Sequence, residues 1–177
     1  MKIRSLLAVL AATVFMSESA FALSCARANI GQTMETAKSS DDLYYILVGT
    51  FTSKPIPKPQ QKAVVDPRNQ FETSKPKMVE AWFDGRILSN HKEFDTAVTR
   101  KPIDVEVTCA GPWCGSAPAN GTEVIAFVKA RPGLPMLLQA GPCPDKVFRL
   151  DRKKPQLKKL RACFDKTCAP DPKFDKL

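Results

Sequence analysis

Six cysteines constrain this chain more than any other feature, because all of them follow a start that is typical of an exported protein. They are Cys25, Cys109, Cys114, Cys143, Cys163 and Cys168. An even number of cysteines in an oxidising compartment predicts disulfides, and a small exported domain gains much of its stability from such bonds. The cysteines therefore predict a fold that is stabilised by three disulfides.

The start of the chain has the three parts of a secretory signal peptide. Residues 1–4 carry two positive charges, residues 5–16 are small and apolar, and Ala20-Phe21-Ala22 is a small-x-small cleavage site. We expect a signal peptide over residues 1–22 and a secreted or periplasmic protein without a transmembrane span. A lipid anchor on Cys25 is the less favoured alternative, because Ala22-Leu23-Ser24 fits a lipobox only at Ser24.

Spacing alone does not fix the disulfide connectivity. Cys163 and Cys168 are expected to form a local pair, and Cys25 is expected to pair with Cys109, Cys114 or Cys143. Two cysteine pairs share the spacing C-x4-C, so a four-thiolate zinc site is the alternative. Export favours disulfides over metal thiolates, and we therefore expect no metal site.

Patterns of hydrophobicity predict a mainly β protein. β-branched, aromatic or alternating runs predict strands over residues 43–51, 78–83, 103–108, 122–128 and 136–140. Ile30, Met34 and Ala37 recur at helical spacing, so a short helix is expected to end within 39–42. Asp84-Gly85 is a hairpin-turn signal, which predicts a return strand over residues 86–88, and a further short element is expected over residues 94–100.

Two polar segments carry much of the positive charge. The net charge is +9, and residues 54–77 form an exposed loop rich in Pro and Lys. The segment 151–177 is predicted to form a basic helix, with Leu157, Leu160 and Phe164 on one face, and a loose tail. The candidate partner-binding residues are Lys54, Lys58, Lys62, Lys153, Lys154, Lys158, Lys159 and Arg161.

The residue inventory argues against an enzyme. The chain contains one histidine, His91, and lacks both the GxGxxG and the GxxxxGK[ST] nucleotide fingerprints. A Cys25–His91 nucleophile pair has no third orienting group in the sequence and would need an unpaired cysteine. We therefore expect no catalytic residues and no cofactor.

Several short motifs resemble those of the netrin-like superfamily, which includes exported bacterial proteins similar to tissue inhibitors of metalloproteinases. The matching pieces are the early Cys25, the strand 46–51, the segment 79–87, the Cys-Gly step in 109–115, the strand 121–128 and Gly141-Pro142-Cys143. The resemblance covers residues 24–150. It implies a small closed β-barrel of the oligonucleotide/oligosaccharide-binding type with one or two short flanking helices.

The resemblance also has a clear departure. The metalloproteinase inhibitors begin with Cys-x-Cys, and the amine of the first cysteine chelates the protease zinc. Here Ala26, Arg27 and Ala28 follow Cys25, and Leu23 and Ser24 are expected to precede it. An amine displaced by two residues does not chelate in the same way.

The sequence thus predicts a signal peptide (1–22), a barrel domain (23–150) and a basic helix with a tail (151–177). The expected function is that of an exported, monomeric, non-catalytic binding module. Its partner is expected to be a protein or an acidic envelope component, and no nucleic-acid partner is expected because few aromatic residues accompany the basic ones. The alternatives are a metalloprotease inhibitor that acts through its N-terminal ridge and an electrostatic binder of envelope polyanions.

Overall fold

The structure, a computed structural model, describes residues 25, 28–54, 75–110, 113–150 and 155–168. The predicted signal peptide, most of the Pro/Lys loop and the segment 169–177 lie outside the described residues. The helices are α2 (Ile30–Ser39), the 3-10 helix η1 (Lys92–Phe94) and α3 (Pro155–Ala162). The strands are β1 (Tyr44–Ser53), β2 (Lys77–Ile87), β3 (Thr96–Val107), β4 (Cys109–Ala110), β5 (Trp113–Cys114), β6 (Glu123–Lys129), β7 (Met136–Ala140) and β8 (Val147–Arg149).

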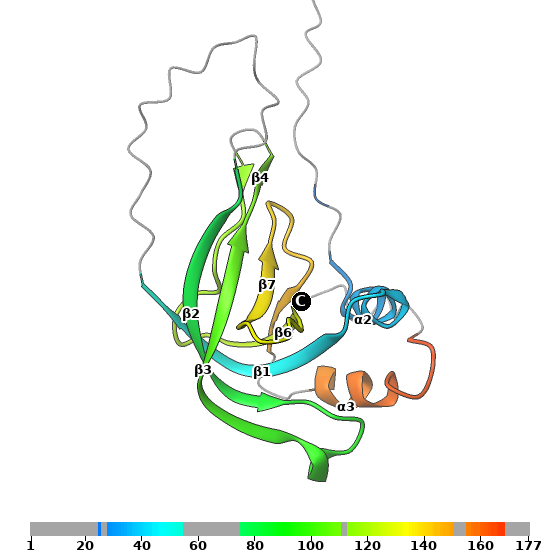
Figure 1. The fold of residues 1–177 in the computed structure, drawn as a ribbon. Coiled ribbons are helices and arrows are strands. Elements are labelled where there is room, and N and C mark those ends of the chain that lie inside the picture. Colours follow the sequence, from blue (N-terminus) through cyan, green and yellow to red (C-terminus); the bar gives the residue numbers. More distant parts are fainter. Residues whose placement is uncertain (1–24, 26–27, 55–74, 111–112, 151–154, 169–177) are drawn as a thin grey trace, which may run out of the picture.

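Five strands close into a barrel in the order β1-β2-β3-β7-β6, and β6 pairs back with β1. All of these pairs are antiparallel except β3 with β7, which run parallel. Strand β8 adds to the outer edge of β6, and β4 and β5 form a separate two-stranded ladder. The prediction of a small closed barrel with flanking helices is therefore confirmed (Figure 1).

Strand β1 is buried on both faces, which explains its continuous apolar sequence. Leu47 and Phe51 point into the barrel, where they pack with Phe83 and Val105, and all four side chains are fully buried. Successive strand residues face opposite sides, so Ile46 lies on the outer face of the barrel. A second hydrophobic cluster covers that outer face.

The second cluster joins the two helices to the outer face of strands β1 and β6. Ile30 and Met34 of α2 and Leu157 and Leu160 of α3 are buried against the outer residues of β1 and β6. Figure 1 shows α2 and α3 side by side on this flank of the barrel. The two predicted helices are thus confirmed, and α2 ends at Ser39 as expected. The placement of Phe164 on the C-terminal helix is wrong, because α3 ends at Ala162 and Phe164 lies in the turn after it.

Two glycines allow β1 and β2 to approach closely. Gly49 and Gly85 face each other across the β1–β2 pair. A Cβ atom on Gly49 would lie 2.1 Å from the carbonyl oxygen of Asp84, and one on Gly85 would lie 2.3 Å from that of Val48. Side chains therefore do not fit at either position.

The predicted turn at Asp84-Gly85 is wrong. Strand β2 continues through both residues to Ile87, and the chain reverses at residues 88–95, where η1 lies. A register shift against β3 occurs between Phe83 and Gly85, and Gly85 has a φ of 156°. The Asp-Gly signal thus marks a β-bulge, because the long pairing of β1 with β2 overrides the local turn preference.

The six cysteines form three pairs at disulfide distance: Cys25–Cys143, Cys109–Cys114 and Cys163–Cys168. The local pair Cys163–Cys168 is confirmed, and the partner of Cys25 is Cys143. Each C-x4-C motif forms its own disulfide, so the motifs do not supply four thiolates to a metal. Cys25–Cys143 joins the start of the described chain to the loop between β7 and β8.

Candidate binding site

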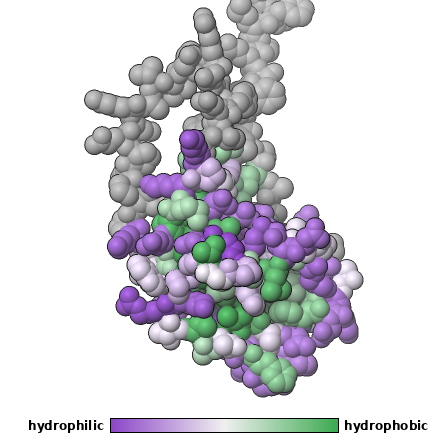
Figure 2. All heavy atoms as spheres, viewed as in Figure 1, coloured by the Kyte–Doolittle hydropathy of each residue, from purple (hydrophilic) through white to green (hydrophobic). Residues whose placement is uncertain are grey.

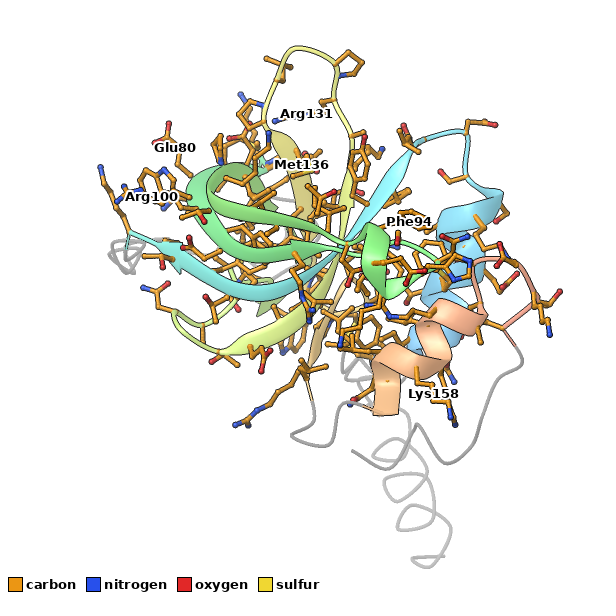
Figure 3. All side chains as sticks on the ribbon, turned by 90° about the horizontal axis from the view of Figure 1, so that it is seen from below. Glu80, Phe94, Arg100, Arg131, Met136 and Lys158 are labelled. Atoms are coloured by element: carbon orange, nitrogen blue, oxygen red, sulfur yellow. A yellow bond between two sulfur atoms is a disulfide. The ribbon has the colours of Figure 1, made fainter. Side chains whose placement is uncertain are left out.

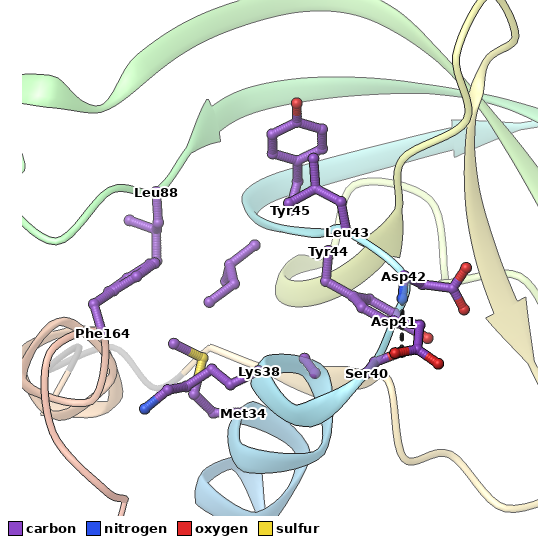
Figure 4. Close-up of a pocket in the computed structure, with 12 residues that line it drawn as sticks. Met34, Lys38, Ser40, Asp41, Asp42, Leu43, Tyr44, Tyr45, Leu88 and Phe164 are labelled. Carbon is purple, nitrogen blue, oxygen red and sulfur yellow. Dashed lines mark hydrogen bonds between the residues drawn. The ribbon is translucent and has the colours of Figure 1, made fainter.

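A pocket of about 470 Å³ opens where the helical flank meets one end of the barrel. Its apolar lining includes Met34 of α2, Ile46 of β1, Leu88 after β2 and Phe164 after α3. Figure 4 shows Leu88 and Phe164 on one side of the pocket, with Asp41 and Asp42 on the opposite side. Three parts of the chain that are distant in the sequence, namely residues 34–46, Leu88 and Phe164, therefore build one hollow.

Two large apolar side chains at this pocket remain in contact with solvent. Leu43 is 62% exposed and Tyr45 is 37% exposed. Figure 2 shows apolar surface between hydrophilic side chains on the lower part of the described molecule. Large apolar side chains gathered around a hollow are typical of a surface that binds a partner.

The turn between α2 and β1 is fixed on both sides. The hydroxyl oxygen of Ser40 accepts a hydrogen bond from the backbone N–H of Asp42. The carbonyl oxygen of Leu43 accepts from the N–H of Ala130. The Asp42 carboxylate lies 2.6 Å from the Lys129 ammonium group, and this hydrogen bond raises the pKa of Lys129. The rim of the pocket is therefore ordered before any partner binds.

Contacts between α2 and the Cys163–Cys168 segment fix a further wall of the pocket. The Lys38 ammonium group donates to the carbonyl oxygens of Cys163 and Lys166, each at 3.1 Å. The backbone N–H of Cys168 donates to the Glu35 carboxylate at 2.8 Å, and this hydrogen bond lowers the pKa of Glu35. These contacts hold Phe164 beside Met34.

An ion pair joins α3 to the loop between β2 and β3. The Arg161 guanidinium donates to both carboxylate oxygens of Asp95, at 2.8 and 2.5 Å, and to the carbonyl oxygen of Ser89. The Asp95 side chain is only 3% exposed. The hydrogen bonds from Arg161 hold the pKa of Asp95 below its usual range.

The predicted basic contact residues that lie in the described ranges do not line the pocket. Lys54 is exposed beyond the far end of β1, and Lys158 and Lys159 are exposed on α3. Arg161 forms the ion pair with Asp95 and so is a structural contact within the chain. The remaining four predicted residues, Lys58, Lys62, Lys153 and Lys154, lie outside the described residues.

The described basic side chains do not form one continuous patch. Figure 3 shows Arg100 at the barrel and Lys158 on α3, on well-separated parts of the molecule. The outer face of β2 and β3 also carries carboxylates, since Glu80 and Asp104 are directly opposite each other. Asp104 forms an ion pair with Arg131. Negative charge on this face repels phosphate groups.

The sequence contained a signal for the pocket, but it was interpreted only as a strand. Residues 43–45 are apolar and directly follow Asp41-Asp42. The other walls come from Met34, Leu88 and Phe164, which only the folded chain brings together. No local pattern joins these segments.

The alternative of a Cys25–His91 nucleophile pair is wrong, because Cys25 forms a disulfide. His91 lies at the start of η1, where its ring packs edge-on against Phe94. Cys25 is bonded to Cys143 and is therefore not a free thiol. In the part of the chain that the structure describes, no group of three or more His, Cys, Asp or Glu side chains is placed to hold a metal ion.

Comparisons with protein-family models, with curated proteins and with solved structures find no match to this chain. None of the helices in the described ranges is long and apolar enough to cross a membrane. The function of this chain is therefore inferred from the geometry and chemistry of its own site.

Proposed function

We propose that this chain is an exported, monomeric and non-catalytic binding module that holds a segment of a partner protein in the pocket between α2 and β1. The observation that carries the proposal is an apolar hollow with Leu43 and Tyr45 exposed at its opening. The fitting ligand is an apolar or aromatic side chain that is flanked by Lys or Arg. The apolar group would fill the hollow, and the cation would lie near the exposed Asp41 carboxylate.

Two features support export. The first 22 residues have the pattern of a signal peptide. The disulfide pairs are typical of proteins that mature in an oxidising compartment. A netrin-like relationship belongs to the same proposal, and the closed barrel and the Cys25–Cys143 pair support it.

Selection of displayed random peptides against the immobilised mature protein tests the proposed site. We expect enriched peptides to combine an aromatic or aliphatic residue with Lys or Arg. Leu43→Asp should weaken their binding at least about tenfold, because it places a charge at the apolar opening. Leu134→Asp is the matched control, since Leu43 and Leu134 are both 62% exposed and Leu134 does not line the pocket.

Two results would contradict the proposal. One is a selection that enriches no peptide above an unrelated disulfide-bonded protein. The other is a set of enriched peptides that bind the Leu43→Asp and Leu134→Asp variants equally well. If both variants still bound the peptides, the binding site would lie on another surface of the barrel.

The Cys25–Cys143 disulfide supports protease inhibition as a second candidate function. This bond holds the start of the described chain against the loop that follows β7. Inhibition of a zinc metalloprotease by protein that begins at Cys25, but not by protein that begins at Leu23, would favour this candidate. Equal activity of the protease with both forms would exclude it.

The exposed Lys158 and Lys159 of α3 support binding of an envelope polyanion as a further candidate. Binding to dextran sulfate should then fall steeply with salt and should weaken when both lysines are replaced by alanine. Replacement of Lys77 and Lys101 on the barrel is the control. Equal losses in the two double variants would indicate a response to net charge alone.

A further inference from the structure

The segment that follows Cys168 begins beside the pocket. Cys168 is buried, and its N–H donates to Glu35, which lies one helical turn before Lys38 of the pocket lining. Phe164, four residues earlier, also lines the pocket. The position of Cys168 is held further by its disulfide to Cys163. Residues 169–177 therefore start from a fixed point next to an open apolar hollow.

We propose that residues 169–177 of the same chain occupy this pocket by placing the Phe174 side chain in it. Phe174 follows Cys168 by six residues, which span up to about 20 Å when extended. The stretch of α2 from Glu35 to Ser39 rises only about 6 Å. The linking residues are therefore long enough to reach the far wall of the pocket.

The composition of this segment fits the pocket. Phe174 lies between Lys173 and Asp175, and Lys176 and Leu177 follow, so an aromatic ring and a cation occur next to each other. The ring would contact the apolar lining, and a lysine would lie near Asp41. Pro170 and Pro172 favour an extended backbone, which reduces the entropy lost on docking.

The other segments outside the described residues are less suited to the pocket. The segment 55–74 leaves from the end of β1 opposite to the pocket, and β1 is about 30 Å long. The segment 151–154 contains only Asp, Arg and Lys. Residues 169–177 begin beside the pocket and also contain a large aromatic side chain, Phe174.

The contact between residues 169–177 and the pocket does not depend on the proposed function. Its effect on partner binding does rest on that function. A docked segment competes with a partner, so the apparent affinity for the partner falls with the fraction of open pockets. Short connections of this kind give effective concentrations in the millimolar range. Weak intrinsic binding is therefore enough to close a large share of the pockets.

Photo-crosslinking in the full mature chain tests the contact. A benzophenone-bearing phenylalanine at position 174 should crosslink to residues 34–45 of the same chain, and one at position 71 in the Pro/Lys loop is the control. Mixing isotope-labelled and unlabelled protein separates bonds within one chain from bonds between copies. Crosslinks scattered over other surfaces, or formed mainly between copies, would overturn the inference.

A second measurement uses the peptides selected for the partner site. Phe174→Ser should raise their affinity for the full chain about two- to tenfold, whereas Phe71→Ser should leave it unchanged. Equal affinities for both variants, together with crosslinks outside the pocket, would refute the docking and leave the partner site intact. Crosslinks to the pocket without any selected peptide would refute the proposed function alone.

Discussion

The barrel interior and its helical flank are stabilised in different ways. Inside the barrel, apolar side chains from neighbouring strands pack against each other, and closed strand pairing satisfies the backbone. On the flank, short helices depend on a local disulfide, on hydrogen bonds from Lys38 and on the Asp95–Arg161 pair. Cooperative strand pairing around an enclosed core thus supports one region, whereas a second hydrophobic cluster and a few specific polar contacts support the other.

This difference explains why the pocket lies on the flank. A closed barrel of this size fills its interior with side chains, and Leu47 and Phe51 leave no exposed surface there. The flank joins the end of α2, the turn and strand start that follow it, and single residues after β2 and after α3, and these leave a hollow between them. Binding on this protein is therefore expected where packing is assembled from separate segments.

The largest expected effect is the loss of the long-range disulfide, which tests whether the barrel needs a covalent connection to its flank. Cys25→Ser/Cys143→Ser should lower the free energy of unfolding by about 5 kcal/mol, because this bond restricts a loop with a sequence separation of 118 in the unfolded chain. Cys109→Ser/Cys114→Ser should cost about 2 kcal/mol, since its separation is 5. Equal midpoints in urea unfolding would contradict this order.

The next prediction concerns the barrel alone. Gly49→Ala should lower the free energy of unfolding by about 3 kcal/mol or more, because its Cβ would overlap the Asp84 carbonyl oxygen at the β1–β2 crossing. Gly133→Ala is the control, because open space surrounds it and only its φ of 72° opposes a side chain. That variant should lose about 1 kcal/mol. A smaller loss for Gly49→Ala would show that the strands separate easily there.

The contrast between the barrel and its helical flank also explains which features the sequence could predict. Strand β7 occupies the predicted residues 136–140, and β6 differs from its predicted range by one residue. In both strands the apolar side chains are buried, apart from Leu137 of β7, which is half-buried. Burial of apolar surface determines both the hydrophobic pattern of the sequence and the position of these strands in the barrel. The pattern alone was therefore sufficient to predict β6 and β7.

Two features depended on contacts that no local pattern contains. The first half of β3 was predicted only as a separate short element over residues 94–100 and not as part of one long strand, because Thr99, Arg100 and Lys101 are polar and exposed. The role of Arg161 was also missed, because its partner Asp95 is distant in the sequence. Helical spacing identified the buried face of α3 but did not show which of its cations forms an internal ion pair.

Removal of the ion pair tests the flank. Arg161→Met should lower the free energy of unfolding by about 2–3 kcal/mol, because it leaves the buried Asp95 carboxylate without its main partner. Asp42→Asn, which removes an exposed ion pair with Lys129, should cost less than about 1 kcal/mol. A double variant with Asp95→Asn should be less destabilised than the sum of the single changes. Additive losses in urea unfolding would show that the two side chains do not act as a pair.

The smallest expected effect is the pH dependence of that pair. Hydrogen bonds from Arg161 make the folded-state pKa of Asp95 lower than its unfolded value of 3.8. The stabilisation is therefore complete above the unfolded value and is lost as the pH falls through the folded value. Urea unfolding at pH 7, 5, 4 and 3 should show a steeper loss of stability on acidification for the wild type than for Asp95→Asn. If the free energy of unfolding changed with pH in parallel for both proteins, protonation of Asp95 would not contribute to the pH dependence of stability. The shared pH dependence would then come from Glu35, whose pKa is also lowered in the folded state, and from other carboxylates.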